Sequence, residues 1–167
     1  MDARTGRFVV MGVSGVGKTR TGTLLAEAVG GHFVEGDDLH PPENRAKMAA
    51  GTPLTDQDRW PWLDRVGGTL AEGEPPVVGA CSALRRSYRD RLRRWVPDLV
   101  FVHLVGDRTL IHERLLARKG HFMPPALLDS QFGTLEPLRP EERGLEVPVD
   151  GPAPDVVADL LRRLERL

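Results

Sequence analysis

The sequence has a single cysteine, Cys81, among its 167 residues. One cysteine excludes an internal disulfide and a zinc site built from several thiolates, and it fits a reducing compartment. The apolar run near the N-terminus extends for only about six residues before Ser14, which is too short for a secretory signal or a membrane span. These absences predict a cytoplasmic protein with no membrane partner.

The sequence also lacks an excess of charge of either sign. It carries 23 basic and 24 acidic residues, for a net charge of −1. Nucleic acids and anionic membranes attract proteins with a basic field, so this balance argues against nucleic acid as a partner. Trp60, Trp62 and Trp95 are not interleaved with basic residues and are interpreted as packing anchors. Any anion site must therefore be local.

Short apolar runs alternate with helical patterns along the whole chain. This alternation predicts one α/β domain over residues 1–167, with a parallel five-stranded sheet flanked by helices. The expected strands are residues 7–12, 32–35, 77–80, 99–104 and 145–149. The expected helices are residues 18–29, 42–50, about 58–72, 83–95, 107–118 and a closing helix through Val156 and Leu164. Thr55 or Asp58 can start the third helix, and Pro61 favours a start near Asp58 because it would then fall in the first turn. Asp155 is expected to cap the last helix.

The stretch GVSGVGKT, residues 12–19, lies between the first expected strand and the first expected helix. It matches the pattern G-x-x-x-x-G-K-[ST], whose glycines let backbone N–H groups turn toward an anion. Lys18 can reach the β and γ phosphates of a nucleotide, and Thr19 can bind Mg²⁺. The pattern predicts a three-layer P-loop NTPase fold. Its expected nucleotide-binding residues are Gly12, Val13, Ser14, Gly15, Val16, Gly17, Lys18 and Thr19.

Residues after this loop separate the protein classes that share it. A GTPase would carry an Asn-Lys-x-Asp motif, which is absent, and a molecular motor would carry an apolar strand that ends in Asp. The strand at residues 77–80 continues instead as Cys81-Ser82. The second expected strand leads into EGDDLHPPENRAKM, residues 35–48, which puts Asp37 and Asp38 at the sheet edge where ligands bind. This arrangement favours a small-molecule kinase.

Several motifs resemble those of the small gluconokinases. They are Glu35-Gly36-Asp37-Asp38-Leu39-His40-Pro41, Asn44, Lys47-Met48, Pro53-Leu54-Thr55-Asp56, Pro61-Trp62-Leu63, Cys81-Ser82-Ala83-Leu84, Tyr88-Arg89-Asp90, Arg118-Lys119-Gly120-His121-Phe122, Gln131-Phe132 and Thr134-Leu135-Glu136. The resemblance implies transfer of the γ-phosphoryl group of ATP to the 6-hydroxyl of D-gluconate with Mg²⁺, on a fold similar to shikimate and nucleoside monophosphate kinases. It also implies a homodimer. The family commonly has Asp where Glu35 stands, and little loss is expected because that side chain need not reach the substrate.

The same region supplies candidates for the acceptor site. Asp37 is expected either to act as the base or to hold the accepting hydroxyl and the water shell of the magnesium ion, the alternative being a turn cap. Arginine suits the carboxylate of gluconate better than lysine does, because it forms two parallel bonds. Arg85 and Arg89, four residues apart, are expected to share a helical face. The expected substrate-binding residues are Asp37, His40, Lys47, Arg59 and Arg85, and the expected metal-binding residues are Thr19 and Asp37.

Residues 119–137 contain Gly120 and several prolines, which predicts a mobile lid. Arg114 and Arg118 are spaced to project together from the preceding helix. By similarity to the related kinases, Arg118 would meet the transferring phosphoryl group and act with Lys18 and Asp37 in catalysis, while Arg114 would contact the nucleotide. The alternative is that both decorate an exposed helical face. Residues 149–152 correspond to the place where related kinases put a loop against adenine, or form a simple turn.

Two other functions stay open at this point. One is a shikimate-type kinase, a nucleoside monophosphate kinase or another small-metabolite kinase of the same fold, although residues 39–62 match neither named family's acceptor motifs. The other is a non-catalytic nucleotide-binding regulator. The presence of Lys18, Thr19, Asp37 and Arg118 argues against the regulator.

Overall fold

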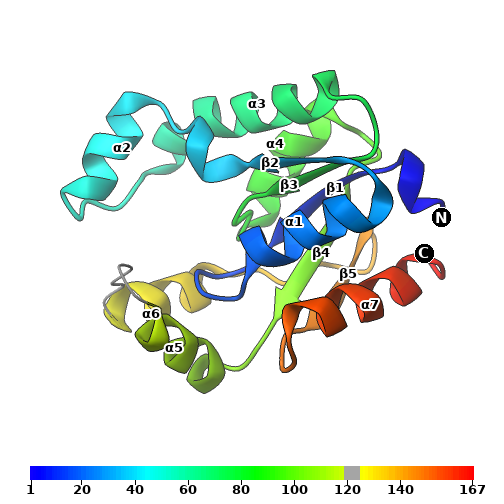
Figure 1. The fold of residues 1–167 in the computed structure, drawn as a ribbon. Helices are drawn as coiled ribbons and strands as arrows, with labels where there is room; N and C mark the ends of the chain where they lie inside the picture. The colour runs from blue at the N-terminus through cyan, green and yellow to red at the C-terminus, as the bar shows by residue number, and fades with distance from the viewer. Residues whose placement is uncertain (119–124) are drawn as a thin grey trace.

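The computed structural model describes residues 1–118 and 125–167, and Figure 1 shows their arrangement. Five parallel strands form one sheet in the order β2-β3-β1-β4-β5. The strands are β1 (Arg7–Met11), β2 (His32–Glu35), β3 (Val77–Ala80), β4 (Val100–Val105) and β5 (Gly144–Pro148). The predicted five-stranded parallel sheet is therefore confirmed, and β1 lies at its centre.

Helices cover both faces of this sheet (Figure 1). They are α1 (Lys18–Val29), α2 (Pro42–Ala49), α3 (Asp56–Glu72), α4 (Arg86–Trp95), α5 (Arg108–Ala117), α6 (Pro125–Thr134) and α7 (Ala153–Leu164), with short 3-10 turns η1 (Ala3–Thr5) and η2 (Gly36–Leu39). Successive residues of a strand point to opposite faces. Phe8 and Val10 accordingly pack with α1 and α7, whereas Val9 and Met11 pack with α3 and α4. The result is a three-layer fold. Within residues 1–118 and 125–167, no helix has the length and apolar character needed to cross a membrane.

Helix α3 begins after Thr55, the earlier of the two starts that the sequence offered. Thr55 is its N-cap and accepts a hydrogen bond from the N–H of Asp58, whose carboxylate accepts from the N–H of Thr55. This reciprocal arrangement is a capping box, which fixes the helix start independently of the proline. Pro61 therefore lies inside the helix rather than in its first turn. The helical bond that it lacks would go to the carbonyl of Gln57, an exposed residue that water can reach.

Two other expectations about helices were wrong, and one helix was not expected. Helix α4 begins at Arg86 rather than at residue 83, because Ala83 has a φ of 45°, which is incompatible with an α-helix. Pro152, not Asp155, is the N-cap of α7, and Asp155 lies in the first turn. Residues 125–134 of the expected lid form helix α6, in which Leu128 is buried in the core. Residues 119–124 of that lid lie outside the described residues.

The core encloses one charged pair. Arg89 of α4 is 0% exposed and donates from Nε and Nη2 to the carboxylate of Glu142 at 2.7 and 3.0 Å, and from Nη1 to the carbonyl of Ala83 at 2.9 Å. The pair ties α4 to the segment that precedes β5. Arg85, by contrast, is the exposed N-cap of α4 and lies outside the helix. The expectation that Arg85 and Arg89 share a helical face was therefore wrong.

Candidate active site

Residues 12–17 connect β1 to α1 as a tight loop. Gly12, Gly15 and Gly17 have φ angles of 146°, 85° and 96°, in a region that side chains rarely allow. A Cβ atom on Gly15 would lie 2.6 Å from Cγ of Leu115, so α5 packs directly against the loop. Helix α1 then begins at Lys18 with its first N–H groups unpaired inside the helix. Such a loop, followed by the positive end of a helix dipole, can bind an anion.

The side chain of Lys18 folds back across this loop. Its Nζ donates to the carbonyls of Gly12 and Val13 at 2.9 and 3.0 Å. Burial lowers the pKa of Lys18, and the negative charge of Asp37 is the strongest influence in the opposite direction. Arg118 lowers the same pKa through its positive charge. The tertiary structure therefore brings both Asp37 and Arg118 within electrostatic range of Lys18, although the three residues follow three different strands.

A carboxylate whose side chain was not expected to take part lies next to Thr19. The Thr19 hydroxyl donates to Oε2 of Glu35 at 2.5 Å, and Oε1 of Glu35 accepts from the N–H of Asp37 at 3.4 Å. Hydroxyl and carboxylate oxygens are the donors that Mg²⁺ prefers, so Thr19, Glu35 and Asp37 fit this ion. Sequence reasoning missed Glu35 because strand β3 separates β1 from β2, and only the folded sheet reveals which side chains meet at its edge.

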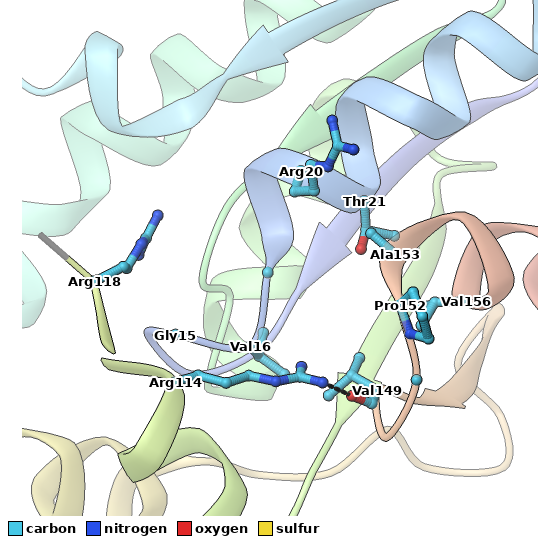
Figure 2. A pocket seen from close by; sticks show the side chains of 12 residues that line it. Gly15, Val16, Arg20, Thr21, Arg114, Arg118, Val149, Pro152, Ala153 and Val156 are labelled. Atoms are coloured by element: carbon cyan, nitrogen blue, oxygen red, sulfur yellow. Dashed lines mark hydrogen bonds between the residues drawn. The ribbon is translucent and has the colours of Figure 1, made fainter. Parts of the chain in front are cut away.

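A pocket of about 330 Å³ opens beside the phosphate loop (Figure 2). It has the dimensions of a small-ligand site. Its lining residues come from the loop, from α1, from α5 and from the start of α7: Gly15, Val16, Gly17, Arg20, Thr21, Arg114, Arg118, Val149, Gly151, Pro152, Ala153 and Val156. The segment at residues 149–152, which the sequence left open between a turn and an adenine loop, thus contributes to the pocket. Arg20 was missed, although its place directly after Thr19 was an available signal.

Both arginines singled out on α5 line this pocket. Arg114 lies in the last turn of the helix and donates from Nη2 to the carbonyl of Val149. Arg118 is the exposed C-cap, and Figure 2 shows that its side chain projects in a different direction from that of Arg114. The positive charge of Arg118 acts on Lys18, whereas Arg114 binds the carbonyl of Val149. The two arginines therefore serve different parts of the pocket. Arg118 faces the phosphate loop, and Arg114 faces the segment after β5.

His40 is packed inside the protein rather than displayed at the surface. It is 6% exposed, and its ring stacks on Trp62 with centroids 4.1 Å apart. Its Nδ1 lies 3.2 Å from Nδ2 of Asn44, and the indole N–H of Trp62 donates to the carbonyl of Gly36 at 2.8 Å. Burial lowers the pKa of His40, which favours the neutral ring. These contacts anchor the turn that carries Asp37.

Lys47 pairs with the start of α3. Its Nζ lies 2.7 Å from Oδ2 of Asp58, the same carboxylate that caps the helix. The hydrogen bonds from Lys47 and from the N–H of Thr55 lower the pKa of Asp58 to about 2. The ammonium group of Lys47 is therefore held at the end of the segment that connects α2 to α3.

Arg59 and Arg85 both lie near Tyr88. The guanidinium of Arg59 lies 5.2 Å from the centre of the Tyr88 ring, and Arg59 pairs with Asp56 at 3.7 Å. Oδ1 of Asp56 accepts from the Tyr88 hydroxyl at 2.6 Å. Burial, followed by this bond to Asp56, raises the pKa of Tyr88 to about 12, while the positive charges of Arg59 and Arg85 act in the opposite direction. The fold thus gathers two of the expected substrate residues around one tyrosine.

Comparison with known proteins first defines the fold. No model of a known protein family matches the chain. A shikimate kinase from Bacteroides thetaiotaomicron has the same architecture, with a TM-score of 0.70 at 17% identity over 96% of this chain and 98% of that chain. Together with the phosphate loop, this likeness confirms the predicted three-layer P-loop fold, in the form that small kinases have.

Closer relatives then define the family. The gluconokinase of Gluconobacter oxydans (strain 621H) is 48% identical over 159 residues, which cover 93% of this chain and 89% of that protein. The crystal structure of a gluconokinase from Sinorhizobium meliloti 1021 is 52% identical, with a TM-score of 0.90 over 98% of this chain and 93% of that chain. The chain belongs to the gluconokinase family, as its motifs predicted.

Proposed function

We propose that this chain transfers the γ-phosphoryl group of ATP to the 6-hydroxyl of D-gluconate, giving 6-phospho-D-gluconate and ADP. The observation that supports the proposal is that the charges of Asp37 and Arg118 both act on Lys18 of the phosphate loop, beside a pocket that Arg118 lines, in a chain that belongs to the gluconokinase family. In this proposal Lys18 and Arg118 supply positive charge for the phosphates, and Asp37 supplies a carboxylate for the accepting hydroxyl.

The nucleotide is proposed to bind across the loop and the adjoining pocket. Within residues 12–19, the phosphates would be held by the N–H groups of Gly15, Gly17, Lys18 and Thr19, as the positive end of α1 favours negative charge there. The nucleoside would occupy the space between α1, α5 and the segment after β5, with Arg114 at its edge. Arg20 lines the same space and is an additional candidate for contact with the nucleotide.

The reaction requires charge stabilisation more than covalent chemistry, because phosphoryl transfer passes through a loose transition state. The gluconate 6-oxygen forms a bond to the γ-phosphorus while the bond from that phosphorus to the ADP oxygen breaks. In this proposal, Lys18 and Arg118 stabilise the charge on the phosphoryl oxygens, and Asp37 orients the hydroxyl and takes its proton. Mg²⁺, when bound, neutralises charge on the β and γ phosphates. Thr19, Glu35 and Asp37 are the residues proposed to hold that ion or its water shell.

Gluconate itself needs a cation for its carboxylate and polar groups for its hydroxyls. Arg59 and Arg85, which meet at Tyr88, are proposed to hold the carboxylate, since guanidinium groups match its geometry. Lys47 is proposed to bind a sugar oxygen from the neighbouring segment. A hydrogen bond from His40 to a hydroxyl would use Nε2, because Nδ1 faces Asn44.

An ADP-release assay tests the proposed function directly. The purified chain is supplied with ATP and Mg²⁺ and, in separate reactions, with D-gluconate, other aldonates, shikimate or a nucleoside monophosphate. ADP release with D-gluconate well above the others supports the proposal. Release with shikimate or a nucleoside monophosphate instead would assign the chain to another small-metabolite kinase activity. ATP binding without ADP release in any reaction would identify a non-catalytic nucleotide-binding protein.

The role of Asp37 is tested by Asp37→Asn with Asp38→Asn as a matched control. Both aspartates are exposed and adjacent, but only Asp37 is a principal charge partner of Lys18. Asp37→Asn is expected to keep ATP binding and to lower turnover by about 10² to 10⁴-fold, the usual contribution of a general base. Asp38→Asn is expected to retain turnover. Equal turnover in the two variants would remove Asp37 from the mechanism.

The proposal also includes a cytoplasmic location and a homodimer, as the family resemblance implies. Sedimentation equilibrium of the purified chain tests the second of these. A mass of one chain over the micromolar range would contradict the dimer.

A further inference from the structure

The side chain of Gln131, on α6, forms a hydrogen bond with the phosphate loop. Its Oε1 accepts from the backbone N–H of Ser14 at 2.7 Å. An N–H group can only donate, so the amide oxygen of Gln131 must be the atom that faces it. Gln131 belongs to a motif that pointed to the family, but the sequence assigned it no role.

The bond controls the orientation of one particular peptide group. The N–H of Ser14 and the carbonyl of Val13 belong to the same trans peptide, so they point to opposite sides of it. The Val13 carbonyl accepts from Nζ of Lys18 at 3.0 Å, while the Ser14 N–H donates to Gln131. The peptide is therefore held from both sides, by Lys18 on one and by Gln131 on the other. Rotation of this peptide would break both bonds.

Helix α6 is itself firmly placed. Leu128, one turn before Gln131, is 1% exposed and lies in the same core cluster as Val13 and Leu115. Phe132 packs against that cluster from the next position. After the helix, the N–H of Glu136 donates to the carbonyl of Leu84 at 2.7 Å. Gln131 is thus presented to the loop from a packed helix.

We propose that Gln131 is a positioning residue for Lys18. By accepting from the Ser14 N–H, it keeps the Val13 carbonyl turned toward the Lys18 ammonium, so that this ammonium is already oriented when a nucleotide binds. The inference rests on the proposed function only in that the loop binds nucleotide phosphates. It does not depend on which acceptor is phosphorylated.

Two substitutions of Gln131 test the role of its acceptor oxygen independently of the length of its side chain. Gln131→Met keeps the length but has no strong acceptor, whereas Gln131→Glu keeps an oxygen that can accept from Ser14. Gln57→Met is the matched control, because Gln57 is exposed and lies on α3 rather than on the helix that faces the loop. Leu128 retains the packing of α6 in all three variants, and Gln131→Ala repeats the test should the Met variant fail to fold.

The first measurement is hydrogen exchange of the Ser14 amide by NMR in the nucleotide-free protein. Exchange is expected to accelerate about 3- to 10-fold in Gln131→Met, as the loss of one hydrogen bond predicts, and to stay near the wild-type rate in Gln131→Glu and Gln57→Met. The nucleotide-free state is used so that the added charge of Glu does not act on bound phosphates. Unchanged exchange in Gln131→Met, or fast exchange in Gln131→Glu, would overturn the proposal.

The second measurement is the affinity for ATP, by calorimetry without any acceptor, together with kcat. Gln131→Met is expected to weaken ATP binding or lower kcat by about 3- to 10-fold, because Lys18 loses its fixed orientation, while Gln57→Met changes neither. Accelerated exchange at Ser14 with unchanged ATP affinity and unchanged kcat would show that the bond has no positioning role. Failure of the chain to phosphorylate gluconate leaves the exchange and affinity results intact, so the two proposals fail separately.

Discussion

The buried pair of Arg89 and Glu142 makes the free energy of unfolding sensitive to one substitution, Glu142→Gln. The change replaces a carboxylate with an amide of nearly the same shape. Both side chains are 0% exposed, and Arg93 also donates to Glu142 at 2.7 Å. The variant therefore leaves Arg89 charged, enclosed and without its counter-charge. Breaking a buried pair in this way costs about 3 to 5 kcal/mol.

The pKa of Glu142 supports the same direction. Burial acts to raise this pKa, but the hydrogen bonds from Arg89, from the N–H of Arg139 and from Arg93 lower it from 4.5 to about 2. A carboxyl whose pKa is lower in the folded state stabilises the fold when it is ionised. This stability is present above pH 4.5 and is lost as the pH falls toward about 2.

Urea denaturation of wild type and Glu142→Gln at pH 7 and at pH 3 tests this reasoning. At pH 7 the variant is expected to unfold about 3 to 5 kcal/mol more easily, equivalent to about 6 to 20 °C in Tm for a chain of this size. The difference is expected to shrink at pH 3, since the Glu142 carboxyl is then protonated in the unfolded chain but still largely ionised in the folded one, so that protonation favours unfolding of the wild type. Glu141→Gln is the control, because Glu141 is 57% exposed and water screens its pair with Arg86. Equal stabilities of the two variants at pH 7 would refute the argument.

Two further predictions concern the active site. Arg118→Ala is expected to lower kcat about 10² to 10³-fold, since it removes one positive charge that stabilises the transition state. Stability is expected to be retained, since the side chain of Arg118 is exposed. Steady-state rates measure this effect, with Arg108→Ala at the other end of α5 as the control, and an unchanged kcat and ATP KM would exclude the role. Glu35→Gln is expected to raise the Mg²⁺ concentration for half-maximal rate about 10-fold, because Thr19 loses its charged partner. An unchanged magnesium titration would show that Glu35 does not help to bind the ion.

Local patterns predicted the strands well because each is a short apolar run followed by a helical pattern. Every expected strand is present, with ends displaced by at most one residue. Helix starts were less predictable where a single backbone angle or a reciprocal cap decided them, as at Ala83 and Thr55. Helix α6 was missed because its glycine and neighbouring prolines obscure its pattern, and burial of Leu128 stabilises it from outside the segment.

Some residues of the candidate site could likewise be predicted from local patterns, and others could not. The phosphate loop could be predicted because its chemistry lies in eight consecutive residues, whose glycines, lysine and threonine act where they stand in the chain. Glu35 and Gln131 could not, because each acts through a contact with a segment that is distant in the sequence. Arg89 shows the same dependence: its spacing from Arg85 suggested a shared helical face, and its burial beside Glu142 makes it part of the core.

The sequence by itself therefore determined the fold class, the phosphate loop and the family, because these depend on periodicity and on contiguous motifs. Only the tertiary structure decided which groups come together: the Thr19 hydroxyl with Glu35, the Ser14 N–H with Gln131, and the charges of Asp37 and Arg118 near Lys18. The physical reason is that hydrogen bonds and charge interactions act over a few ångströms in space. Distance along the chain does not determine which groups come that close.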